Sequence, residues 1–140
     1  MMSKKIVSVV GTMFFRDGKL LIDKPKERPT FQMVGGRIEK GETPLETAIR
    51  ENKEELGNQF IYDESKLRFI MDFKEVATSD PKLDIHMYVF QYDGELGGKT
   101  TTSEEIEAFM WFGINDNQTL LSNTLKNKIL PYAIKNKLIY

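Results

Sequence analysis

Three glutamates at helical spacing, Glu51, Glu54 and Glu55, are the residues whose types and positions could do chemistry. Residues three and four apart share one face of a helix, so these carboxylates are expected to lie close together. At about 6 Å, each pair would repel by roughly 3 kcal/mol at an effective dielectric constant of 20. A divalent cation relieves such repulsion, and carboxylate oxygens suit Mg²⁺ or Mn²⁺. The spacing therefore predicts a hard-metal site on one helix face.

The flanking residues predict the helix that carries these carboxylates. Thr43 is expected to be its N-cap, with Pro44 at the first helical position and Glu46 completing a capping box. Gly57 is expected to end the helix, because glycine adopts the left-handed backbone at little cost. The side chains predicted to face inward follow helical spacing and are Leu45, Ala48, Ile49, Asn52 and Leu56.

Together with the glycines around it, this stretch resembles the Nudix box of the Nudix hydrolases, as in MutT-like members. The matching residues, at the family's spacing, are Gly36, Glu42, Arg50, Glu51, Glu54, Glu55 and Gly57. Seven fixed positions in a strand–loop–helix context are a specific signal, although the box covers only about a sixth of the chain. Val34, Asn52 and Asn58 depart from the pattern, because the family usually has proline or a bulky aliphatic residue there.

The resemblance implies hydrolysis of a nucleoside diphosphate linked to another group, with Mg²⁺ as cofactor and Mn²⁺ as a possible substitute. The preferred substrate is a nucleoside or deoxynucleoside triphosphate, or an oxidised dNTP, giving a nucleoside monophosphate and pyrophosphate. A dinucleoside polyphosphate, a nucleotide sugar or ADP-ribose are the alternatives with the same chemistry. A regulator that binds a nucleotide without hydrolysing it is the alternative from another class, and only the departures from the box favour it.

Residue by residue, the resemblance implies the following roles in the metal shell. Glu54 and Glu55 are expected to bind metal, and Glu51 is expected either to bind metal or to act as the base that activates water. The carbonyl of Gly35 is expected to complete the shell.

Two arginines have roles that the resemblance suggests and simpler explanations also cover. Arg50 is expected to orient the glutamates by pairing with one of them while Glu42 fixes the loop, but an ordinary ion pair along the helix explains Arg50 equally well. Arg37 is expected either to contact a phosphate or to be solvated.

Family members often recruit a further glutamate from the loop before a late strand. Glu105 is the preferred candidate over Glu104 and Glu107, although all of these carboxylates could simply be solvated. Asn123 stands where MutT-like members place an asparagine that recognises the base, and a helix N-cap explains it as well.

Composition sets wider limits on function. The 140 residues are 40% apolar and 29% charged, with a net charge of −1 and no cysteine, as expected for a single globular domain over residues 1–140. That charge balance favours a small-molecule nucleotide over nucleic acid or a membrane as partner. Lys4 and Lys5 precede an apolar run as in a leader peptide, but no cleavage site follows, and a cytoplasmic protein is expected. The oligomeric state stays open.

The remaining pattern predicts the elements that position the site. A hairpin turning at Asp17-Gly18 is expected first, and a kink or fresh helix start is expected at Pro131 in the last helix. The polar loop over residues 24–30 is expected to be a solvated connector or a phosphate contact. The predicted strands are Lys5–Phe15, Lys19–Asp23, Phe31–Val34, Leu67–Thr78, Leu83–Tyr92 and Ile106–Ile114, and the last helix is Leu120–Leu138. This order predicts an α/β fold with a mixed sheet between helices, and the resemblance implies the Nudix α/β/α sandwich.

Overall fold

The computed structural model describes residues 5–140, so Lys4 lies outside the described part of the chain. The strands are β1 (Lys5–Met13), β2 (Phe15–Arg16), β3 (Lys19–Pro25), β4 (Gln32–Arg37), β5 (Phe60–Ile61), β6 (Leu67–Val76), β7 (Leu83–Tyr92), β8 (Gly97–Gly98) and β9 (Ile106–Phe112). The α-helices are α1 (Pro44–Leu56) and α2 (Leu130–Lys135), and shorter 3₁₀ and π turns lie at Glu64–Lys66, Gln118–Leu120 and Leu125–Ile129.

The main sheet is mixed, as predicted. Its strands run in the order β2-β3-β4-β1-β7-β6, and β9 pairs with the other edge of β3. β1 pairs antiparallel with β4 and parallel with β7. β7 pairs with β1 on one side and with β6 on the other, so it lies inside the sheet.

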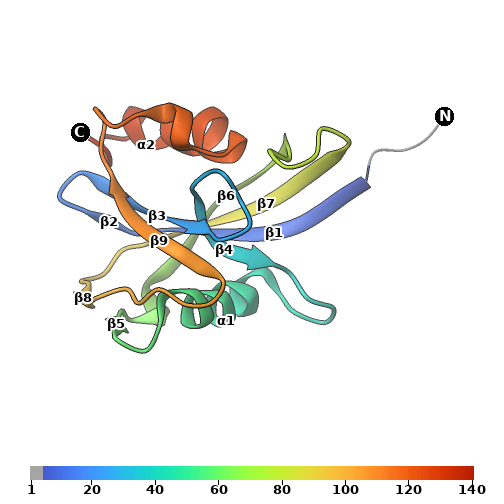
Figure 1. Ribbon diagram of the computed structural model, residues 1–140. Coiled ribbons are helices and arrows are strands. Elements are labelled where there is room, and N and C mark those ends of the chain that lie inside the picture. The colour runs from blue at the N-terminus through green and yellow to red at the C-terminus, as the bar shows by residue number, and fades with distance from the viewer. Residues whose placement is uncertain (1–4) are drawn as a thin grey trace.

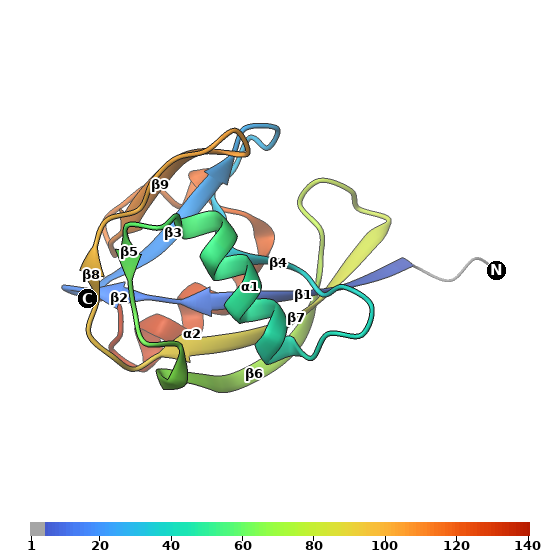
Figure 2. The ribbon, with the colours of Figure 1, turned by 90° about the horizontal axis from the view of Figure 1, so that it is seen from below.

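The helices cover opposite faces of this sheet (Figure 1). Seen from the α1 side, α1 crosses over the central strands β4, β1 and β7 (Figure 2). The arrangement confirms the mixed sheet between helices that the order of elements predicted, and it is the α/β/α sandwich that the resemblance implied (Figure 1). Among residues 5–140, no helix is long and apolar enough to cross a membrane.

Alternation along β3 shows how the strands serve both faces. Leu20 and Ile22 belong to the core on the α2 side, whereas Leu21 belongs to a core on the α1 side. Because successive strand residues point to opposite faces, the next position, Asp23, lies on the α1 side with Leu21. The alternation of the strand therefore places the Asp23 carboxylate beneath α1.

The local predictions are largely confirmed, with two corrections. The hairpin turns at Asp17-Gly18, and both residues have positive φ. Pro131 stands in the first turn of α2, so it opens a new helix after the π turn, and the predicted single helix over Leu120–Leu138 is shorter than expected. Leu45 was predicted to face inward but is 43% exposed; Thr47 is buried instead, because it bonds back into the loop before α1.

Candidate metal centre

The start of α1 is built as the capping signals predicted. The backbone N–H of Glu46 donates to Thr43 Oγ1 at 3.2 Å, and the N–H of Thr43 donates to Glu46 Oε1 at 3.0 Å. Pro44 occupies the first turn, and Gly57 ends the helix with φ of 84°. These caps fix where α1, which packs against β4 and β1, begins and ends, and therefore which residues lie on its turns.

Gly35 and Gly36 allow the backbone of β4 to lie close to β1 and to α1, respectively. A Cβ on Gly35 would lie 1.9 Å from the carbonyl oxygen of Val10, and Gly35 has φ of +154°. A Cβ on Gly36 would lie 2.3 Å from Cδ of Glu51. Only glycine therefore leaves room for the Glu51 carboxylate against this strand.

Arg50 is the centre of an ionic network at the exposed side of the site. Its Nε donates to Glu42 Oε2 at 2.7 Å and its Nη2 to Glu42 Oε1 at 2.9 Å, a bidentate pair. Its Nη1 donates to Glu51 Oε1 at 2.9 Å and to Glu54 Oε2 at 3.4 Å. Its Nη2 also donates to the Arg37 carbonyl at 3.1 Å, so one guanidinium joins α1 to the preceding loop.

Glu42 completes this loop from the other side. Its Oε1 accepts the N–H of Glu39 and the hydroxyl of Thr47, both at 3.0 Å. Hydrogen bonds from Arg50 and the Glu39 backbone lower the pKa of Glu42 from 4.5 to about 2. The loop thus depends on an ionised carboxylate.

Glu55 points away from Arg50 and toward the sheet. The N–H of Gly35 lies 3.5 Å from Glu55 Oε2, and the carboxyl groups of Glu55 and Asp23 face and hydrogen-bond to one another. Asp23 is only 1% exposed, and its Oδ2 has no hydrogen-bond partner among residues 5–140. An acidic pair, with Asp23 buried and Glu55 partly buried, therefore lies below the helix, and no basic side chain among residues 5–140 affects the pKa of either member.

Burial changes the protonation of these groups. It raises the pKa of Asp23 from 3.8 to about 6, although the hydrogen bond with Glu55 acts in the opposite direction. Burial is also the main cause that raises the pKa of Glu55, together with the hydrogen bond to Asp23. Glu51 has a raised pKa mainly because of burial, despite its pairing with Arg50.

The carboxylates do not all converge on one point. Within residues 5–140, no three acidic or histidine side chains lie close enough together to hold a metal ion as they stand. Arg50 holds Glu51 and Glu54, whereas Glu55 faces Asp23. The donor set nevertheless fits Mg²⁺ or Mn²⁺: every donor is an oxygen, and the partnerless Oδ2 of Asp23 is a buried oxygen that a cation would satisfy.

A cavity of about 240 Å³ lies on the other side of Gly35 and Gly36. Its apolar wall comes from β1, β4 and β7 and includes Val9, Met33 and Met87. Arg28 and Arg37 also line it. Gly36 lies against the Glu51 carboxylate and also lines this cavity, so the cavity and the glutamates share the glycine pair as a boundary.

Some predicted site residues lie at other positions around the centre. Asn123 donates its backbone N–H to Thr78 Oγ1 at 2.8 Å and its amide to the Val76 carbonyl at 3.2 Å, while its neighbours Ser122 and Thr124 line the cavity. It therefore joins the last helical segment to the end of β6.

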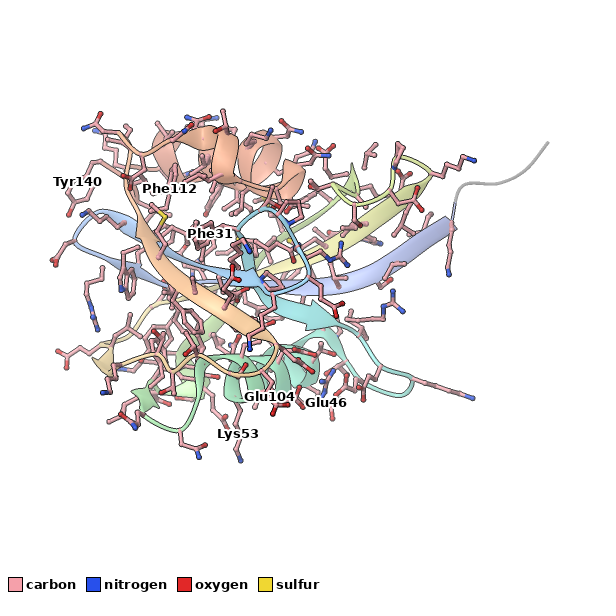
Figure 3. The ribbon with its side chains drawn as sticks, in the orientation of Figure 1. Phe31, Glu46, Lys53, Glu104, Phe112 and Tyr140 are labelled. Atoms are coloured by element: carbon pink, nitrogen blue, oxygen red, sulfur yellow. The ribbon has the colours of Figure 1, made fainter. Side chains whose placement is uncertain are left out.

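Glu105 lies in the loop before β9 and is exposed. Figure 3 shows Glu104, from the same loop, on the α1 side of the sheet. The loop also crosses the end of α1, because Thr101 donates its N–H to the Leu56 carbonyl at 3.2 Å. Glu107, the remaining candidate, forms an ion pair with Lys24.

Asp23 is the residue that sequence reasoning missed. A signal was available. Asp23 directly follows the apolar run Leu20–Ile22, and it lies on the same face of the strand as the core residue Leu21, two positions earlier. An acidic residue at an inward strand position predicts a buried carboxylate. Its partner could not be predicted, because the pairing with Glu55 depends on how α1 packs against β3.

Comparison with known families and structures adds to this geometry. The model of the NUDIX domain family matches residues 5–133. The uncharacterized Nudix hydrolase YvcI of Bacillus subtilis (strain 168) is 30% identical over 123 residues, which cover 86% of this chain and 74% of that protein.

Solved structures share the fold at lower identity. The MutT protein from Methanosarcina mazei Go1 superposes with a TM-score of 0.74 at 16% identity, covering 98% of this chain and 99% of that one. A bifunctional NMN adenylyltransferase/ADP ribose pyrophosphatase from Francisella tularensis, complexed with AMP and a Mn ion, superposes with a TM-score of 0.69 at 15% identity. That match covers 96% of this chain and 43% of the bifunctional enzyme.

Proposed function

Because this chain belongs to the Nudix hydrolase family, whose members hydrolyse nucleoside diphosphates linked to another group, we propose that it is a Mg²⁺-dependent nucleotide pyrophosphatase. The proposed substrate is a nucleoside or deoxynucleoside triphosphate, including an oxidised dNTP. The products are the nucleoside monophosphate and pyrophosphate. Mn²⁺ is proposed as a substitute for Mg²⁺.

The observation that carries this proposal is the position of the cavity beside the glycine pair. Its apolar wall suits a nucleobase, and Arg28 and Arg37 at its lining suit phosphate oxygens. At about 240 Å³, the cavity lies just below the usual size of ligand pockets, which is about 300–1,000 Å³. A compact nucleotide fits that size better than a dinucleoside polyphosphate.

The proposed chemistry assigns a task to each group of the box. When bound, the divalent cation supplies charge stabilisation for phosphate oxygens and lowers the pKa of a bound water. Glu54 and Glu55, with the Gly35 carbonyl, would hold it. Glu51 would bind it too or would accept the proton of the attacking water, and the burial that raises the Glu51 pKa favours the second task.

The remaining residues are proposed to position these groups and the substrate. Arg50 would hold Glu51 and Glu54 through the contacts that it already makes. Arg37 would contact a phosphate. Asn123 is proposed to contact the base through its amide oxygen, since its amide nitrogen bonds Val76. Glu105 is proposed as the additional metal ligand from the loop before β9.

The experiment follows the formation of nucleoside monophosphate, together with the release of phosphate and pyrophosphate, from a panel of nucleotides. The panel contains dNTPs, 8-oxo-dGTP, ADP-ribose, a dinucleoside polyphosphate and a nucleotide sugar, each assayed with Mg²⁺ and with chelator. We expect one triphosphate to be hydrolysed well ahead of the others, with pyrophosphate as product and only when metal is present.

Other outcomes have definite meanings. A preference for ADP-ribose, a nucleotide sugar or a dinucleoside polyphosphate would keep the chemistry and replace the substrate. Nucleotide binding without turnover of any panel member would contradict hydrolysis and favour a regulatory role.

A further inference from the structure

Asp23 is placed where an aliphatic residue would complete the core. It follows Leu21 on the same face of β3, and Leu21 packs with Val34 and Leu56 under α1. Burying an ionised carboxylate at such a position costs several kcal/mol unless a partner compensates it. The Asp23 side chain is 1% exposed and its Oδ2 has no hydrogen-bond partner. Packing alone does not account for a carboxylate here.

Among residues 5–140, the groups that affect the pKa of Asp23 are the carboxylates of Glu55 and Glu51, and none is basic. Glu55 hydrogen-bonds to its carboxyl group from above, and the Gly35 backbone lies against Glu55 Oε2. The nearest guanidinium in the network, that of Arg50, is occupied by Glu42, Glu51 and Glu54 on the exposed side. Lys24, the next residue along β3, pairs with Glu107.

We propose that Asp23 is a further metal ligand of this protein, binding a divalent cation together with Glu55 from the strand side of the site. The inference rests on the proposed metal dependence and adds to it a ligand from outside the Nudix box. A cation between the carboxylates would satisfy Oδ2 and neutralise the pair. Both carboxylates, and the nearby Gly35 backbone, supply the oxygen ligands that Mg²⁺ and Mn²⁺ prefer.

The competing explanation is a purely structural acid pair, in which one proton is shared and no cation enters. Asp23→Asn distinguishes the explanations, because asparagine keeps the size and hydrogen-bonding capacity of the residue but binds cations weakly. Asp72→Asn is the matched control: it removes the same charge from β6, where Asp72 pairs with His86 at the surface.

The measurement is Mn²⁺ binding to the metal-stripped full chain, by calorimetry and by the EPR signal of free Mn²⁺, without nucleotide. For Asp23→Asn we expect at least a tenfold weaker Kd or the loss of one bound Mn²⁺, in line with the tenfold to hundredfold effects of altered metal shells. For Asp72→Asn we expect a change within about twofold. Melting in chelator should show Asp23→Asn to be at least as stable as the wild type.

The outcomes separate this inference from the proposed function. Wild-type protein that fails to bind Mn²⁺ would overturn both. Wild type that binds Mn²⁺, with Asp23→Asn binding it equally well, would overturn only the role of Asp23. If Asp23→Asn does not fold, Asp23→Ser provides the same comparison with a smaller neutral side chain.

Discussion

The carboxylates of α1 form two regions that differ in their source of countercharge. Glu51 and Glu54 both face Arg50, whose single guanidinium holds them, although the Glu51 side chain is 16% exposed and that of Glu54 is 58% exposed. Glu55, adjacent in sequence to Glu54, points to the sheet and meets another carboxyl group, that of Asp23. One region is neutralised by the chain itself, and the other is an acid pair that only a proton or a cation can neutralise.

The difference shows that an acidic helix face does not by itself make a metal site. On the exposed side, solvent and Arg50 already relieve the repulsion that the spacing of the glutamates suggests. On the buried side nothing in the described chain does so. The buried pair is therefore the stronger structural reason to expect a divalent cation at this centre.

The largest effect is expected from Glu54→Gln. The change removes a proposed metal ligand that is 58% exposed at its side chain, so metal-dependent turnover should fall roughly a hundredfold or more while the fold is kept. Glu46→Gln on the same helix is the control, because glutamine still completes the capping box. Undiminished turnover of Glu54→Gln, with an unchanged melting temperature, would contradict the assignment of Glu54 as a metal ligand.

A smaller loss is expected from Arg50→Lys. Lysine keeps the charge but cannot make the bidentate pair with Glu42 while also reaching Glu51 and Glu54. Turnover should fall roughly tenfold, because the glutamates lose their orientation. Arg68→Lys, at the exposed pair with Asp93, should leave turnover unchanged. Equal activity of Arg50→Lys and the wild type would mean that the network is only a surface ion cluster.

The buried pair should give the protein a distinctive pH dependence in chelator. The folded-state pKa of Asp23, about 6, lies above its ordinary value of 3.8, so the folded protein binds this proton more tightly than the unfolded chain. The stabilisation of the folded state by this bound proton is therefore fully present below about pH 4 and is lost as pH rises through about 6. Relative to Asp23→Asn, the wild type should lose on the order of 1–3 kcal/mol of unfolding free energy between pH 4 and pH 7.5.

Denaturant unfolding of the wild type and of Asp23→Asn across that pH range measures this loss of unfolding free energy. Glu42, whose pKa is lowered, changes the stability of both proteins in the opposite direction with pH. The difference between the two proteins therefore reports only the Asp23–Glu55 region. A constant difference between the proteins at all pH values would show that the pair is not desolvated in the native state.

The smallest effect is expected from Asn52→Leu. Asn52 is fully buried, its amide lies 3.4 Å from the Tyr62 hydroxyl, and its Oδ1 has no partner. Leucine should leave stability unchanged or raise it by up to about 1 kcal/mol, because an unsatisfied buried acceptor is removed. Asn58→Leu, at an exposed position, is the control. A drop of several degrees in melting temperature for Asn52→Leu alone would show that the amide makes a required hydrogen bond.

How much could be predicted from sequence depended on how local the signal was. The capping box at Thr43 and the turn at Asp17-Gly18 were predicted because neighbouring residues determine them. The inward position of Leu45 was predicted wrongly. Helical spacing predicts which residues share a face, but not where along that face burial begins: Leu45 is 43% exposed, whereas Ala48 is fully buried.

By itself, the sequence determined the Nudix box, the α/β layers and the glutamates available for chemistry, since these depend on spacing and on short-range backbone preferences. Only the tertiary structure decided which glutamate meets Arg50 and which meets Asp23. The contact between Asp23 and Glu55 joins β3 to α1 across 32 positions of sequence, from 23 to 55. Such a contact follows from the packing of a helix on a sheet, and no local pattern along the chain encodes it.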